Sequence, residues 1–163
     1  MRSDAPFDDI DFGELPDSVN ELLQRGVIAH RGDRAEADRL FRAALALDPA
    51  ALPTYLCLYK IHTYQGNLAE ARTIAQAGLA EAARQAEWLG PWQHWPVAPA
   101  PLDGPGRFAL YTLKALAFIA LRDNRTDDAA EILTALRRLD PAGAVGWPVI
   151  AALADGIGEA VAA

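Results

Sequence analysis

The sequence contains few side chains that could act as nucleophiles. Cys57 and His62 are five residues apart and are the residue types of a cysteine–histidine catalytic pair. On the helix predicted for this segment, five residues turn through about 140°, so the two side chains do not share a face. The serines are Ser3, near the start of the chain, and Ser18, which precedes Glu21 as a helix N-cap would. We therefore expect no catalytic residue and no enzymatic activity.

Metal and cofactor sites are not indicated either. His30, His62 and His94 show none of the short spacings that metal-binding motifs need. The single cysteine excludes an internal disulfide and a four-thiolate zinc site. The sequence also lacks a glycine-rich phosphate-binding loop. We expect neither a metal nor a cofactor.

The charge balance restricts the class of partner. The formal net charge is −7, whereas nucleic-acid binding depends on clustered Lys and Arg. The longest apolar run, Phe108–Leu121, is too short to span a bilayer and contains Lys114. The first residues carry no apolar core of a signal peptide. We therefore expect a cytoplasmic protein that binds neither nucleic acid nor membrane.

The elements that position these residues are helices in a repeat. A shift of 34 residues places Gly32 on Gly66 and Ala37 on Ala71. A third copy, residues 122–141, follows after a step of 58 residues, which is one period plus an insertion of 24. The alanines allow two antiparallel helices to approach closely, and the glycines supply a left-handed turn between them.

These copies resemble the tetratricopeptide repeat (TPR), in which a small Ala is followed by an aromatic residue four positions later and then by a Pro. The first copy has Ala37, Phe41 and Pro49, and the third has Ala129 and Pro141. The resemblance is to small bacterial three-repeat proteins of this family. It implies an all-α, right-handed helical solenoid of antiparallel helix pairs with a C-terminal capping helix. The implied organisation is an acidic segment at 1–17, a TPR-like domain at 18–155 with repeats at about 18–51, 52–85 and 110–143, an insertion at about 86–109, a cap at about 144–155, and a tail at 156–163.

The insertion concentrates tryptophans and prolines. The second copy lacks its Pro, so its last helix is predicted to run on to about Leu89, where Gly90 and Pro91 would stop it. One interpretation of Trp92 and Trp95 is that they fold down and cover this longer helix. The other is that they anchor a partner at the edge of a groove. After the third copy, Trp147 begins the predicted cap.

In TPR proteins, the first helix of each repeat lines a concave groove that holds peptides. Carried over by position, the resemblance puts these residues in the groove: Leu22, Leu56, Lys60, Tyr64, Tyr111, Lys114, Phe118 and Arg122. Rings and cations together suit a segment with acidic and aromatic side chains. Tyr111 and Phe118 are equally well explained by packing against the insertion.

The resemblance implies a non-enzymatic adaptor or assembly chaperone that binds a protein or peptide. A different class of function is a self-assembling module that forms a homodimer through the Trp-rich insertion or the cap. The stretch LPTYLCLYKIHTYQGNL also resembles small proteobacterial TPR proteins associated with nitrogen-fixation gene neighbourhoods. A further alternative is therefore an accessory protein of bacterial nitrogen fixation.

The segment before the first helix, APFDDIDFGELP, has the composition that this groove would accept. Phe7, Ile10 and Phe12 alternate with acidic residues. A short tether gives an effective concentration of about a millimolar, so even a weak fit would be occupied. Two hypotheses follow: the segment folds back onto the first-helix surface and competes with a partner, or it is an ordinary acidic tail.

Overall fold

The structure, a computed structural model, describes residues 12–162, with side chains described up to residue 157. Within this range, the chain forms seven α-helices, one short 3₁₀ helix and no strand, which confirms the predicted all-α class. The elements are α1 (Asp17–Ala29), α2 (Arg34–Leu47), α3 (Leu52–Tyr64), α4 (Leu68–Ala86), η1 (Trp92–His94), α5 (Gly104–Arg122), α6 (Thr126–Leu139) and α7 (Trp147–Ala162). None of these helices is long and apolar enough to cross a membrane.

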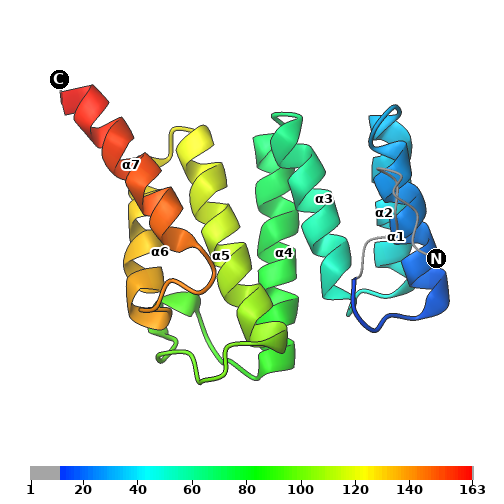
Figure 1. Ribbon diagram of the computed structural model, residues 1–163, viewed down its shortest axis with the longest axis horizontal. Coiled ribbons are helices and arrows are strands. Elements are labelled where there is room, and N and C mark those ends of the chain that lie inside the picture. The colour runs from blue at the N-terminus through cyan, green and yellow to red at the C-terminus, as the bar shows by residue number, and fades with distance from the viewer. Residues whose placement is uncertain (1–11, 163) are drawn as a thin grey trace, which may run out of the picture.

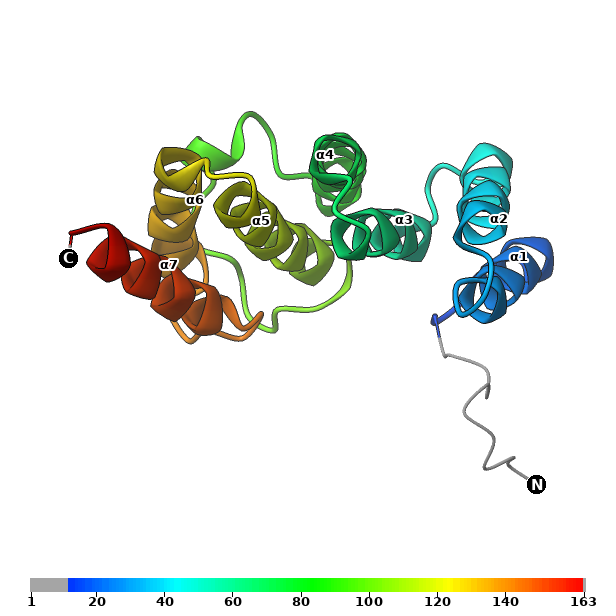
Figure 2. The same cartoon turned by 90° about the horizontal axis from the view of Figure 1, so that it is seen from above.

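The helices lie side by side in chain order, from α1 at one end of an elongated body to α7 at the other (Figure 1). Seen from above, α1 and α3 lie on one side, and α2 and α4 on the other (Figure 2). Each helix packs against its neighbours in sequence, and α5 also contacts α3 and α7. The contacts of α5 bring side chains of α3, α5 and α7 to one face.

The second helix of each predicted pair begins at the expected spacing. α2, α4 and α6 begin at Arg34, Leu68 and Thr126, which are 34 and 58 residues apart as the alignment requires. The aligned alanines, residues 37, 71 and 129, are each 0% exposed. Small buried side chains at these positions let the helix backbones approach closely, because protein interiors leave little free volume.

The turns between paired helices follow the prediction in two of three copies. Gly66 and Asn124 adopt left-handed backbone conformations, with φ of 80° and 60°. The prediction is wrong for Gly32, whose φ is not left-handed. There, α1 ends at Ala29, so one more residue separates the helices than after α3, and the turn closes without a positive φ.

The start of α1 differs from the prediction that Ser18 is its N-cap. The helix begins at Asp17, directly after Pro16, and Ser18 lies inside its first turn. Gly26, which lowers the helix propensity of α1, lies at the crossing with α2. A Cβ atom at this position would come within 2.3 Å of Phe41 Cε1, so the glycine leaves room for the buried Phe41 ring.

The long helix α4 ends at Ala86, three residues before the predicted Leu89. Glu87 takes a left-handed conformation with φ of 60°, and the amide of Trp88 donates to the Ala83 carbonyl at 3.0 Å. The Glu87 amide also donates to Arg84 O at 3.2 Å, which completes a Schellman motif. This cap ends the helix and places Trp88 beside the insertion.

The insertion lies against the helices, as one of the two interpretations predicted. Trp95 is 3% exposed, its Nε1 donates to Gly90 O at 3.0 Å, and its ring meets Trp88 edge to face with centroids 5.1 Å apart. Arg138 of α6 donates to the carbonyl oxygens of Trp95 and Gln93. Because its ring is buried, Trp95 is not an exposed partner contact.

The C-terminal helix is longer than predicted. α7 extends to Ala162, so it includes most of the segment expected as a tail. Its start is fixed by Asp140, which is 4% exposed and whose carboxylate accepts from the amides of Ala144 and Val145, each at 3.0 Å. The Trp147 Nε1 donates to Asp140 O at 2.7 Å, which attaches the first residue of α7 to the end of α6.

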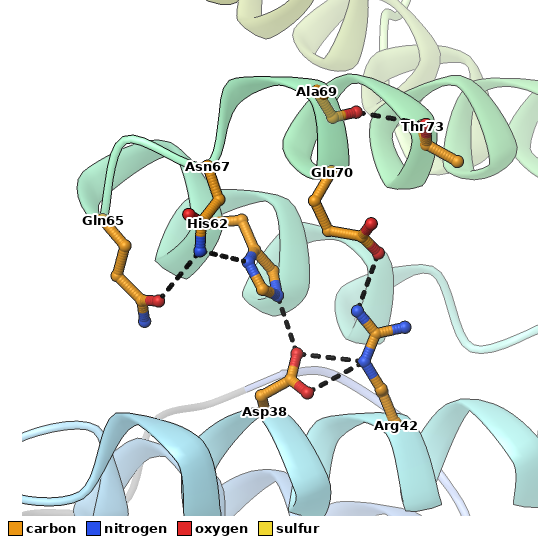
Figure 3. A network of polar contacts seen from close by, with 8 residues as sticks. All are labelled: Asp38, Arg42, His62, Gln65, Asn67, Ala69, Glu70 and Thr73. Carbon is orange, nitrogen blue, oxygen red and sulfur yellow. Dashed lines mark hydrogen bonds and ion pairs between the residues drawn. The ribbon is translucent and has the colours of Figure 1, made fainter.

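A polar network joins α2 to α3 and α4 (Figure 3). Asp38 Oδ1 lies 2.7 Å from His62 Nε2, and Arg42 donates to both Asp38 and Glu70. Asn67 holds the other ring nitrogen of His62 at 3.3 Å. Burial would raise the pKa of Asp38, but hydrogen bonds from His62 and Arg42 outweigh it and hold this pKa below its usual range. His62 is therefore hydrogen-bonded within the fold, between Asp38 and Asn67.

Candidate functional site

Helical spacing puts the predicted groove residues of α3 and α5 on facing surfaces. Lys60 and Tyr64 are one turn apart on α3, and Tyr111, Lys114 and Phe118 follow at intervals of three and four on α5. Together with Ile150 of α7, they enclose an open cavity, which we call cavity A. Cavity A has a volume of about 280 Å³ and is lined by Tyr59, Lys60, Thr63, Tyr64, Tyr111, Lys114, Ala115, Phe118, Ile119 and Ile150.

The floor of cavity A is held by hydrogen bonds within the protein. Tyr59 is 2% exposed, and its hydroxyl lies 3.3 Å from the hydroxyl of Thr112, which joins α3 to α5. Thr63 donates to the Tyr59 carbonyl at 2.6 Å, which fixes its side chain along the helix. Because these polar groups are satisfied within the protein, a ligand in cavity A would meet mainly the rings and aliphatic stems of its walls.

The rim of cavity A is cationic. Burial, followed by repulsion from Lys60 and Arg107, lowers the pKa of Lys114. Its Nζ lies 3.9 Å from the centroid of the Tyr111 ring, an arrangement that holds the amino group over the cavity wall. Among the side chains described, no acidic group forms an ion pair with Lys60 or Lys114. A negatively charged ligand group here would offset the repulsion between the two amines.

A second cavity, cavity B, adjoins cavity A. Lys60 and Tyr64 line both cavities, so they form the wall between them. Cavity B has a volume of about 270 Å³ and is lined by Phe12, Val27, His30, Phe41, Leu56, Cys57, Lys60, Ile61 and Tyr64. α1, α2 and α3 all contribute to it, together with Phe12 from the segment before α1.

Cys57 and His30 are residues of cavity B whose side chains could take part in catalysis. Burial raises the pKa of Cys57 to about 12, so its thiol stays protonated at neutral pH and is a poor nucleophile. His62 faces Asp38 instead, so no Cys57–His62 pair forms. The Nδ1 atom of His30 is buried with no hydrogen-bond partner among the described residues. Cavity B is therefore a mainly apolar site, and one of its lining residues, His30, carries a buried ring nitrogen without a described partner.

The predicted groove residues fall into two groups. Six of the eight line cavity A, cavity B or both: Leu56, Lys60, Tyr64, Tyr111, Lys114 and Phe118. Leu22 instead packs against the core, and Arg122 lies at the end of α5 with its guanidinium 5.8 Å from the Phe118 ring. The half-buried Trp92 lines a separate cavity between α4, α5 and α6.

Sequence reasoning missed Ile150 and Val27 as wall residues. Ile150 enters cavity A because α7 packs against α5, a contact that no repeat alignment specifies. Its position three residues after Trp147 on the predicted cap was the available signal. Val27 follows Gly26 on α1, and its apolar character alone marked it.

Comparisons with protein-family models, with curated proteins and with solved structures returned no match. The interpretation of this face therefore depends on its own geometry. Within residues 12–157, no three His, Cys, Asp or Glu side chains come together as a metal site would require. What the face offers is two adjoining apolar cavities, with the amine of Lys60 where they meet and that of Lys114 on cavity A, an arrangement suited to binding.

Proposed function

We propose that this protein is a non-enzymatic, TPR-like adaptor that binds an acidic segment of another protein across cavities A and B. Three observations support a solenoid of paired helices: α2, α4 and α6 begin at the spacing of the repeat, the aligned alanines are buried, and two of the turns are left-handed. In such a solenoid, the first helices of successive repeats form a groove. Cavities A and B lie along the first helices α1, α3 and α5 of the repeats predicted from the sequence.

The observation that carries the proposal is the pair of amines above cavity A. Lys60 and Lys114 repel each other, and Lys114 is partly desolvated, so the free face is electrostatically unfavourable there. A carboxylate bound between them would relieve that repulsion and form charge-assisted hydrogen bonds. The rings of Tyr64 and Phe118 would contact an aromatic or aliphatic neighbour of that carboxylate.

A peptide array tests the proposal. Eight-residue peptides with varied acidic, basic and aromatic positions are screened, and the best binders are measured by fluorescence anisotropy. We expect binders with Asp or Glu beside an aromatic residue. In the Lys60→Glu/Lys114→Glu variant, affinity should fall about tenfold or more, and the loss should be larger at low salt.

The matched control is Arg34→Glu/Arg72→Glu, which makes the same change in net charge on α2 and α4. This control should keep most of the affinity, because its two positions line neither cavity A nor cavity B. Equal losses in both variants would show a general charge effect and contradict a site at Lys60 and Lys114. Selection of basic or uncharged peptides would contradict the proposed ligand class.

Self-association is a second candidate function, favoured by the outer face of α7. Val149, Leu153 and Ile157 are exposed at intervals of four residues, so they form one apolar stripe. An isologous contact between two such stripes would bury them. The insertion is less suited to this role, because Trp95 is buried. Sedimentation should then show a dimer for the native chain and a monomer for Leu153→Asp, whereas a monomeric native chain at tens of micromolar would contradict the alternative.

A further inference from the structure

Phe12 places the segment before α1 on the binding face. Its ring lines cavity B with Val27 of α1 and Leu56 of α3, and it packs against the core together with Leu15. Phe12 is thus an apolar side chain from outside the helices that already occupies part of the proposed site. Acidic residues lie on both sides of it, at Asp11 and Glu14.

The chain preceding Phe12 alternates apolar and acidic residues, a pattern that suits a path towards cavity A. Cavities A and B share the wall formed by Lys60 and Tyr64, so a segment that crosses this wall would contact both. From Phe12 back to Asp8 is four residues, which span about 13 Å when extended. In an extended chain, alternate side chains face the same way, so Phe12, Ile10 and Asp8 share one side.

Each of these three side chains matches the part of the face that it would meet. Phe12 lies in cavity B, and Ile10 would pass over the wall at Tyr64 into cavity A. In this arrangement Asp8 would pair with the amine of Lys114, which forms no ion pair with an acidic side chain in the described part of the chain. Asp9 and Asp11 would face solvent.

His30 gives a further contact point in cavity B. Its Nδ1 is buried and has no hydrogen-bond partner within the described part of the chain. An extended backbone running past Phe12 presents amide groups that can donate to such an atom. His30 and Phe12 line the same cavity, as a segment bound beside both would require.

We propose that residues 8–12 of this chain (DDIDF) bind in cis across cavities A and B and compete there with the partner segment. Phe12 fills cavity B, Ile10 enters cavity A and Asp8 pairs with Lys114. This inference rests on the proposed function, because it uses the same surface. The short link from Phe12 to α1 gives the segment an effective concentration of about a millimolar.

The test uses the full chain and a fluorescein-labelled synthetic peptide of residues 5–16. If the segment binds the face with an intrinsic dissociation constant of about 100 μM, an effective concentration of about a millimolar keeps the site mostly occupied. The tethered segment should then weaken the apparent affinity for the added peptide roughly tenfold. The Asp8→Asn/Phe12→Ala chain should therefore bind the labelled peptide roughly tenfold more tightly than the native chain. Asp9→Asn is the matched control, and it should bind like the native chain because the proposed arrangement gives Asp9 no contact with the face.

A second readout protects the test against a change in folding. Asp8→Asn alone removes one charge, and it should shift the amide signals around Lys114 in a nitrogen-15 spectrum while Asp9→Asn does not. The inference is overturned if the native and Asp8→Asn/Phe12→Ala chains bind the peptide with equal affinity. It is also overturned if Asp8→Asn and Asp9→Asn shift the same amide signals equally.

The two proposals fail in different ways. If peptides selected on the array bind at Lys60 and Lys114 with equal affinity in the native and Asp8→Asn/Phe12→Ala chains, the adaptor function stands and binding in cis is overturned. If the labelled peptide binds with an affinity that Lys60→Glu/Lys114→Glu leaves unchanged, the segment has another site and the inference is also wrong. If no array peptide binds any chain, the proposed function itself fails.

Discussion

Gly78→Ala tests whether α3 and α4 are packed as closely as the structure shows. A Cβ atom at Gly78 would lie 2.8 Å from the Cβ and 3.1 Å from the Cγ of Tyr55. The Cβ of Tyr55 is fixed to the backbone of α3, and its hydroxyl donates to the Pro49 carbonyl at 2.6 Å, so the side chain cannot swing away without cost. The helices themselves would have to separate.

The magnitude follows from two opposing effects. Replacing glycine by alanine inside a helix stabilises it by about 1 kcal/mol when nothing is in the way. Overpacking a close contact costs about 1–3 kcal/mol. We expect the second effect to dominate at Gly78, with a net loss of about 1 kcal/mol, which lowers the melting temperature of a chain of this size by about 2–4 °C.

Thermal unfolding followed by circular dichroism measures the effect, and Gly156→Ala is the matched control. Gly156 lies inside α7, where an added Cβ would meet nothing within 4 Å. The control should therefore be stabilised by about 0.5–1 kcal/mol. If Gly78→Ala raises the melting temperature as much as Gly156→Ala does, the close crossing of α3 and α4 is wrong.

Two further predictions concern the polar network and the insertion. The pKa of Asp38 is lowered in the folded chain, so its pairing stabilises the fold above the usual Asp pKa and is lost as the pH falls through the lowered value. Urea unfolding should therefore show Asp38→Asn less stable than the native chain at neutral pH, and this difference in stability should shrink as the pH falls below the usual Asp pKa. A difference that stays constant with pH would contradict this. In the same assay, Trp95→Ala should lower the free energy of unfolding by about 3–5 kcal/mol because its ring is buried. Trp92→Ala should lower it clearly less, and equal losses would refute the packing of the insertion.

The starts of α2, α4 and α6 were predictable because the signal for them is local. Ala37, Ala71 and Ala129 must be small wherever paired helices cross, so their spacing fixed the starts of α2, α4 and α6. The end of α4 was missed because its left-handed cap is Glu87, a residue type that seldom adopts this conformation. No pattern in the sequence distinguishes this glutamate from the others.

The site was partly predictable for a related reason. Lys60, Tyr64, Lys114 and Phe118 follow helical spacing, so two helices that face each other bring them together. The burial of Trp95 could not be predicted, because it depends on contacts across the fold, such as Arg138 with the loop carbonyls. The place of Phe12 in cavity B likewise depends on the path of the chain before α1.

The central claim is that a partner segment binds across cavities A and B. The most direct measurement is a nitrogen-15 NMR titration of the native chain with an acidic peptide selected on the array. The account predicts the largest amide shifts around Lys60, Tyr64, Lys114 and Phe118, which line cavity A. Largest shifts along the exposed stripe of α7 or around Trp92, with cavity A unchanged, would contradict it.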